Sequence, residues 1–426
     1  MSVLTRATLA AVAVLGLGAC GGDKASPTEP VDRVSPSCPA INLGPAPERI
    51  DVAPRSPATI QMLGQGVVST RYTAEVAARG TLAYTTTWSN RGGVFGNAIY
   101  VWDVSGNVPT LVDTVIVSGP VTTLGDVAVS DDGKLLVVAT ERSEGSIAVF
   151  DLTEPRRPRQ VSRFGNSETA NGVHTAEIGR VNGKLYAFLS IDPSPSRIVI
   201  VDLSEPTAPR QVFSKEVGRP FIHDTFARSG LLFLGLWNDG MEIWDIGGCG
   251  AGGSPESPVV LGRVLTVNGQ VHNVWWYHDP TGSKSFAFVG EEGAGIIGSS
   301  SHGDIHVVDV SDPALPKEVA FYHLDNAGTH NFWVDEANGI LYAAYYNGGV
   351  RALDIRGDLG ACSPAQQLTI ANNVTRCDLK LMNREIGVGL LDLNRQVYIW
   401  GVQLLNGSIY ASDMLSGIWK LRALSR

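Results

Sequence analysis

The chain has 426 residues, of which 44% are hydrophobic and 18% charged, and this composition is typical of a globular protein. Its net charge of −9 and the lack of a basic cluster exclude a general nucleic-acid-binding protein, because such a protein needs a cationic surface. A single hydrophobic core rarely serves more than about 300 residues, so we expect repeated units that bury their faces against one another.

The N-terminal segment predicts export and a lipid anchor. Arg6 precedes an apolar run, Ala7 to Ala19, that is too short to span a bilayer and has the form of a signal-peptide core. The end of this run, Leu17-Gly18-Ala19-Cys20-Gly21, resembles the lipobox of bacterial lipoproteins, in which the signal is cut before the cysteine and lipid is attached to it. The resemblance implies a lipoprotein signal peptide over residues 1–19 and lipidation of Cys20. An ordinary secretory signal with an incidental cysteine is the alternative.

Residues 20–57 are rich in Pro, Ser, Gly and charge, which predicts a flexible tether. A lipid on Cys20 would attach the protein to a membrane of the bacterial cell envelope, on its extracytoplasmic side. Export also permits disulfides. Cys362 and Cys377 bracket one long insertion and could close it, which by elimination would pair Cys38 with Cys249; the sequence alone leaves three pairings open. Zinc at these cysteines is disfavoured because no CxxC spacing occurs.

One pattern recurs along the chain: an apolar run that ends in Asp, followed by Ser or Thr and then two prolines. The strong copies end at Asp151, Asp202 and Asp309, and weaker copies end at Asp103, Asp245 and Asp354. Intervals of about 40 to 65 residues indicate a stacked or radial repeat. The Asp can accept backbone hydrogen bonds in the turn, and each Pro ends strand pairing because it lacks an N–H.

Each interval holds four short strands separated by turns, which is the sequence form of a propeller blade. Third strands that end near these aspartates and near Trp419 predict an all-β fold over residues 58–426: a seven-bladed β-propeller of four-stranded antiparallel blades. The last blade lacks a fourth strand, which would leave an unpaired edge. We expect Ala58–Leu63 to supply that strand, so that an N-terminal segment closes the ring.

The Asp-ended strands resemble LVIVD repeats, which occur in bacterial secreted and lipid-anchored β-propellers. Arg197-Ile-Val-Ile-Val-Asp202 nearly spells the repeat, and the resemblance extends from about Tyr72 to Leu421. The resemblance implies the fold. It implies little about activity.

Four histidines share one register at the start of the first strand in consecutive blades: His174, His223, His272 and His330. Because the first strand of a blade is the innermost, we expect these imidazoles at the mouth of the central channel. Other first-strand residues and residues of the loops on that face would complete a ligand-binding funnel, namely Tyr72, Glu75, Asp126, Glu177, Trp237, Asp239, Glu291, Tyr346 and Trp400. For His302 and His306, which flank Gly303-Asp304, we expect a solvated turn.

Two interpretations of the shared histidines compete. In one, each imidazole forms a hydrogen bond to the backbone of a neighbouring blade and so holds the two blades together. In the other, the four histidines bind a divalent transition metal (Zn, Fe or Cu), since neutral imidazole suits all three. Iron-dependent carotenoid oxygenases and methanethiol oxidases of the selenium-binding type are similar as histidine-bearing propellers, in architecture alone.

The sequence thus favours a membrane-anchored, monomeric binding or interaction module that meets a small molecule, a glycan or a protein at its central funnel. The alternative is a metal-dependent enzyme, oxidative or hydrolytic, with its multi-histidine site on the propeller axis. An assembly scaffold on the envelope surface is a third class. The sequence does not identify the ligand.

Overall fold

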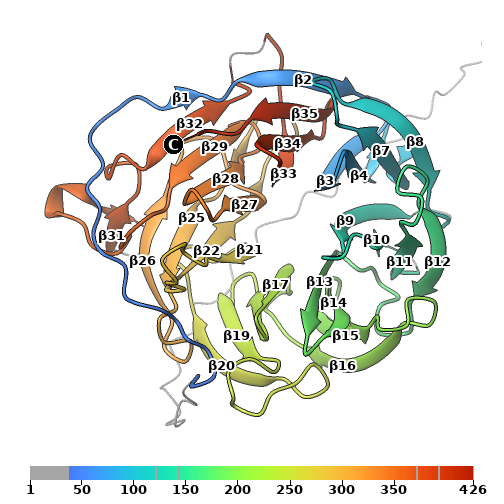
Figure 1. Ribbon diagram of the computed structural model, residues 1–426, viewed down its shortest axis with the longest axis horizontal. Helices are drawn as coiled ribbons and strands as arrows, with labels where there is room; N and C mark the ends of the chain where they lie inside the picture. Colours follow the sequence, from blue (N-terminus) through green and yellow to red (C-terminus); the bar gives the residue numbers. More distant parts are fainter. Residues whose placement is uncertain (1–37, 120–121, 143, 371–372, 392–393, 426) are drawn as a thin grey trace, which may run out of the picture. The chain divides into compact units, whose positions relative to one another are not determined.

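The computed structural model describes residues 38–119, 122–142, 144–370, 373–391 and 394–425, and the regular secondary structure of these residues is almost entirely β-strand (Figure 1). The signal peptide expected over residues 1–19 and the lipidation expected at Cys20 lie outside the described residues. Within the described part, no helix has the length and apolar character that a membrane crossing requires.

The strands form seven four-stranded antiparallel blades arranged in a ring, as predicted (Figure 1). Consecutive strands build the first four blades. Blade one contains β3 (Tyr72–Arg79), β4 (Leu82–Trp88), β7 (Ala98–Asp103) and β8 (Thr110–Ile116). Blade two contains β9 (Thr123–Val129), β10 (Leu135–Glu141), β11 (Ser146–Asp151) and β12 (Arg159–Phe164). Blade three contains β13 (Thr175–Val181), β14 (Lys184–Ile191), β15 (Arg197–Asp202) and β16 (Arg210–Glu216). Blade four contains β17 (Asp224–Arg228), β18 (Leu231–Gly235), β19 (Met241–Asp245) and β20 (Val259–Val264).

Blade five is built like blade one, whereas blades six and seven take their fourth strand from a more distant part of the chain. Blade five contains β21 (Val271–Trp276), β22 (Phe286–Glu291), β25 (Ile305–Asp309) and β26 (Lys317–Tyr322). Blade six contains β27 (Phe332–Asp335), β28 (Ile340–Ala344), β29 (Val350–Asp354) and β32 (Glu385–Gly389). Blade seven contains β33 (Ile399–Leu405), β34 (Ser408–Asp413), β35 (Gly417–Arg422) and β2 (Met62–Val67). Two small hairpins sit in loops: β5 (Asn90–Arg91) with β6 (Val94–Phe95), and β23 (Gly293–Ala294) with β24 (Ser301–His302).

The third strand of a blade is mostly apolar because both of its faces are covered. In β15, Val199 and Val201 pack toward blade two, whereas Ile198 and Ile200 pack toward blade four, and all of them are fully buried. The Asp that ends the strand caps the following turn: one oxygen of Asp202 accepts the backbone N–H of Ser204 at 2.8 Å. The same contact recurs after Asp151 and Asp309. The repeated Asp therefore serves the scaffold, as expected.

An N-terminal strand closes the ring, but it begins later than predicted. β2 pairs antiparallel with β35 and completes blade seven. The expected donor, Ala58–Leu63, overlaps β2 only at its end. Its first residues form β1 (Ala58–Thr59), which pairs parallel with β32 on the outside of blade six. The N-terminal segment thus ties two neighbouring blades together (Figure 1).

Both expected disulfides are present. Cys38 bonds to Cys249, with the two Cα atoms 4.3 Å apart, and Cys362 bonds to Cys377, with 5.9 Å between Cα atoms. The second bridge closes the insertion of blade six, which contains a short 3-10 helix η1 (Pro364–Gln366) and the hairpin β30 (Gln367–Ile370) and β31 (Val374–Asp378). β31 pairs parallel with β26, so this insertion widens blade five at its outer edge.

Candidate functional site

The four histidines of the shared register form a continuous arc at the start of the innermost strands. Successive ring centroids lie 4.3 Å apart from His174 to His223, 4.1 Å from His223 to His272 and 4.2 Å from His272 to His330. Trp400 of β33 continues the arc, 4.3 Å from the His330 ring. Because each residue starts the inner strand of its own blade, ring closure is what brings these distant residues together.

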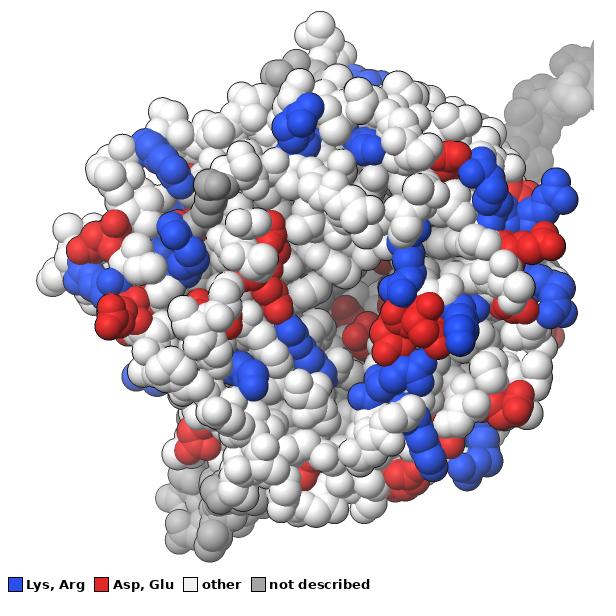
Figure 2. All heavy atoms as spheres, viewed as in Figure 1, with Lys and Arg blue, Asp and Glu red and all other residues white. Residues whose placement is uncertain are grey.

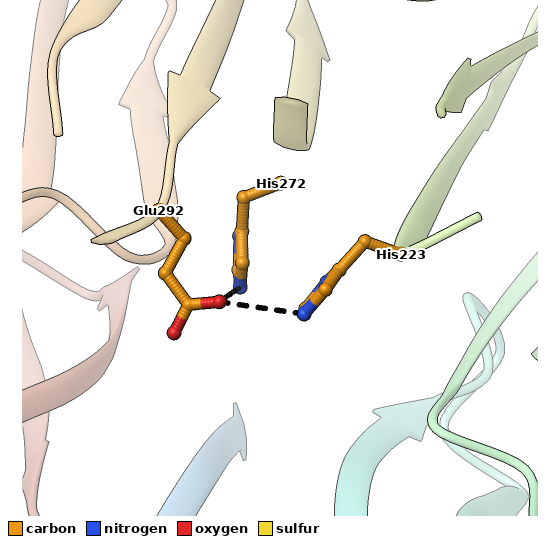
Figure 3. A group of neighbouring side chains, drawn as sticks. All are labelled: His223, His272 and Glu292. Carbon is orange, nitrogen blue, oxygen red and sulfur yellow. Dashed lines mark ion pairs between the residues drawn. The ribbon is translucent and has the colours of Figure 1, made fainter. Parts of the chain in front are cut away.

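Two of these histidines and one glutamate offer donor atoms to a common point. The Nε2 atoms of His223 and His272 lie 3.5 Å and 3.9 Å from Oε2 of Glu292, and all three donor atoms lie within 4.8 Å of one another (Figure 3). Two ligands of one tetrahedral Zn²⁺ ion lie roughly 3–3.5 Å apart, given metal–ligand bonds of about 2 Å. A small inward movement would therefore bring this group to coordination distances.

Of the four histidines in the arc, His272 has the fewest hydrogen bonds from its ring nitrogens. It is buried, and neither of its ring nitrogens makes a hydrogen bond of normal geometry to a described residue. Burial lowers its pKa to about 4, although the charge of Glu292 opposes that shift. Burial, followed by the charges of the neighbouring histidines, also holds the pKa of His223 well below its usual range. Both rings are therefore neutral near pH 7, so each has one ring nitrogen that carries no proton.

The outer two histidines are oriented by hydrogen bonds at Nδ1. His330 donates from Nδ1 to the backbone carbonyl of Trp400 at 2.7 Å, which leaves its Nε2 without a proton in the neutral ring. Nδ1 of His174 lies 3.0 Å from Oε1 of Glu141, and its Nε2 lies 3.0 Å from Nε2 of His223. Carboxylate and carbonyl partners of this kind typically fix metal-ligating histidines.

His174 differs from the other three histidines in charge. Burial alone would lower its pKa, but the charges of Asp192 and Glu141 outweigh burial and raise that pKa to about 10. In the structure as described, His174 is therefore the cation of the arc. Its positive charge balances the carboxylates of Asp192 and Glu141, whereas the rings of His223 and His272 are neutral.

A second layer of polar residues lies directly beyond the histidines along the axis. In the inner strands, Asp224, Asn273 and Asn331 immediately follow a histidine, and Glu75 and Asp126 occupy the equivalent position in blades one and two. Register shifts in β3, β21 and β33 indicate β-bulges, which let two successive residues face the same side. Sequence analysis missed Asp224, Asn273 and Asn331; the repeated His-Asp and His-Asn pairs were the available signal.

This polar layer borders a cavity of about 520 Å³ that the innermost strands of all seven blades line. Figure 2 shows the ring hollowed near its centre, with acidic side chains visible inside the hollow. Burial, and then the charge of Asp126, raises the pKa of Glu75 and that of Asp224 to about 8. Burial likewise holds the pKa of Glu177 well above its usual range.

The residues predicted for a funnel fall into separate groups. Trp237 stacks against His223 with 5.5 Å between centroids, and Tyr346 lies 5.0 Å from the His330 ring and donates its hydroxyl proton to Glu292. Glu75, Asp126 and Glu177 line the axial cavity instead. Two more stand apart from the histidine arc: Tyr72 lies under the Arg91 guanidinium, and Asp239 pairs with Arg219 and Arg263.

Glu291 lies inside blade five rather than beside the four histidines. Its Oε2 lies 3.3 Å from Nε2 of His306, whose Nδ1 lies 2.6 Å from Oε1 of Glu318. His306 is fully buried, so the solvated turn expected there is wrong for this residue, whereas His302 is exposed. The carboxylate at the histidine arc is that of the next residue, Glu292, because successive residues of a strand point to opposite sides.

These features define the class: a seven-bladed β-propeller with a cluster of histidines on its axis. Within that class, the chain carries LVIVD repeats, which match residues 195–216 and 300–323. Each match spans a third strand, its proline turn and the fourth strand, so the repeats predicted around Asp202 and Asp309 are confirmed. No curated protein matches the sequence significantly. The fold and the repeats by themselves suggest, at most, a module for interaction with other proteins.

Proposed function

We propose that this protein is a binding propeller whose site lies on the ring axis and holds a divalent transition metal. The ligands are His223, His272 and Glu292, and the Nε2 atoms of His174 and His330 flank them. One observation carries the proposal: a buried His272 with both ring nitrogens unbonded lies beside two further donor atoms within 4.8 Å. A buried polar atom without a partner costs about 1–3 kcal/mol, and a metal ion removes that cost at His272.

Metal analysis of purified protein tests this proposal. After chelation and reloading with Zn²⁺, Fe²⁺ or Cu²⁺, we expect one ion per chain. We expect His272→Ala to bind that ion at least about 100-fold more weakly, because a lost ligand costs more than a lost outer partner. The exposed His302 provides the matched control, and His302→Ala should bind metal like the parent chain. A folded parent chain that takes up none of the three ions would overturn the proposal.

A catalytic role for the metal is the second candidate. The observation that favours it is a small space on the axis lined by all four histidines together with Glu75, Asp126 and Asp224. A molecule bound to the metal would contact carboxyl groups able to exchange protons with it. Zinc-loaded protein that hydrolyses 4-nitrophenyl acetate, with the activity absent in His272→Ala, supports a hydrolytic enzyme; equal rates for the two proteins count against it.

We also propose that lipid on Cys20 anchors the propeller to the extracytoplasmic side of a bacterial membrane. The two disulfides support export, because disulfides persist in oxidising compartments. In a Triton X-114 phase separation of bacterial cells, the parent chain should enter the detergent phase, and Cys20→Ala should move to the aqueous phase. A parent chain whose N-terminal peptide has no lipid mass would contradict the anchor.

A further inference from the structure

The polar layer of the axial cavity consists mainly of side chains that accept hydrogen bonds. Glu75, Asp126, Glu177 and Asp224 line it, and within the described ranges none of them forms a salt bridge with a Lys or Arg side chain. Arg79 also lines the cavity, but it is exposed at the rim. Crowding and desolvation make these carboxyl groups costly to ionise, so a positively charged occupant would stabilise their ionised forms.

Two buried side chains among these acids have polar atoms that point to the same conclusion. The Oδ1 atom of Asn273 and the hydroxyl of Thr225 make no hydrogen bond to a described residue, although the residues are only 5% and 4% exposed. Both line the cavity. Asn331, whose Nδ2 donates to Glu75, leaves its own Oδ1 unbonded as well. An amide oxygen only accepts, so the partner missing at Asn273 and Asn331 is a donor, and an ammonium group supplies three donors with its charge.

The next layer along the axis is aromatic. Phe226, Trp275 and Trp333 follow Asp224, Asn273 and Asn331 at a spacing of two residues, so they lie on the same face of the inner strands. Their rings form an arc, with centroids 5.2 Å apart from Phe226 to Trp275 and 5.1 Å from Trp275 to Trp333. Each ring is partly exposed, and all three line the cavity. Aromatic faces attract organic cations and cover apolar chains.

We propose that the axial cavity binds an organic ammonium ion, with the nitrogen among the carboxylates and amide oxygens and the hydrocarbon part along the aromatic arc. The cavity, about 520 Å³, has room for such a molecule. Its aromatic wall favours an organic cation over a bare metal ion, which would need only the oxygen layer. None of the proposed metal ligands lines this cavity, although Glu75, Asp126 and Asp224 also line the small space at the histidines.

Calorimetric titration of the full chain, freed of metal by chelation and dialysis, tests the proposal. The probe is 1,5-diaminopentane, with pentane-1,5-diol as its uncharged counterpart and calcium chloride as the bare cation. We expect the diamine to bind and the diol to give no heat. Glu75→Gln and Asp224→Asn should each weaken the diamine about 30-fold or more, the effect of removing one partner of a buried charge pair. Trp333→Ala should weaken it about 5-fold.

The controls distinguish a loss of amine binding from a loss of folding and from an effect on metal binding. Glu154→Gln removes an exposed carboxylate in a turn of blade two and should leave the affinity unchanged. If Asp224→Asn does not fold, Glu177→Gln provides the second acidic-layer variant, with its melting temperature measured beside it. No heat from the diamine overturns the proposal, as does binding that both acidic-layer substitutions leave unchanged. Calcium binding without diamine binding overturns it in favour of a metal ion. Because the protein is metal-free, failure here leaves the histidine site untouched.

Discussion

A chain that starts at Val68 should melt at least about 10 °C below a chain that starts at Cys38, because it lacks the fourth strand of blade seven. β2 is bonded to β35 along its length, and the preceding Ile60 is only 2% exposed. Loss of one buried Ile costs about 1.5–3 kcal/mol, and each lost backbone pair adds about 1 kcal/mol. The free edge of β35 would also invite association with other chains. Differential scanning calorimetry of the two chains measures the change.

Two variants separate strand closure from the other effects of this truncation. Cys38→Ala in the longer chain removes only the disulfide, so its smaller loss of stability can be subtracted. Gly66→Val keeps the whole segment but places a Cβ 2.5 Å from the Trp102 ring, which forces β2 away from blade one. Gly106→Ala, where a Cβ would meet nothing closer than 4.0 Å, should be nearly neutral. Equal melting temperatures for the chains starting at Cys38 and Val68 would contradict closure by β2.

His306→Ala should destabilise the protein by about 3–5 kcal/mol, because it removes the cation between two buried carboxylates, of which only Glu318 has a second one, Arg376 at 3.8 Å. The imidazole lies between Glu291 and Glu318, and none of the three side chains is more than 5% exposed. Urea unfolding of the parent chain and the variant at pH 6 provides the measurement. His302→Ala removes an exposed histidine of the same blade and should change stability by less than about 0.5 kcal/mol.

The cost of His306→Ala should depend on pH. Burial opposes protonation of His306, but hydrogen bonds and charges from Glu291 and Glu318 raise its pKa from 6.5 to about 10. A histidine with a raised pKa stabilises the fold fully below its unfolded pKa of 6.5 and loses that contribution as the pH rises through about 10. The difference between parent and variant should therefore shrink when unfolding is repeated near pH 10. A difference that stays constant would show that His306 acts by packing alone.

Local sequence rules predicted the repeated parts of the fold because their causes are local. An apolar strand ends in Asp202, the Asp caps the next turn, and proline stops the pairing; none of these steps needs information from another blade. The rules failed where the register depends on a neighbour. Ala58–Thr59 had the character of a strand, but it joins blade six, and β2 closes blade seven.

The sequence likewise predicted one part of the candidate site and missed another. The shared register of the four histidines was visible in the sequence, and ring closure brings them to adjacent positions. Their partners were not visible: the loop between the second and third strands of blade five suggested Glu291 rather than Glu292, and Asp224 was passed over. Local bulges and the side on which each residue lies decide that choice.

By itself, the sequence determined the number of blades, the Asp that ends the third strand in six of them and the alignment of the four histidines, because each follows from a short repeated pattern. The third strand of blade seven continues to Arg422, beyond the end predicted near Trp419. Only the tertiary structure decided which strand closes the ring, that His306 is buried between two glutamates, and that acids and aromatics form successive layers on the axis. Those outcomes depend on contacts between residues far apart in the chain, and no local pattern encodes them.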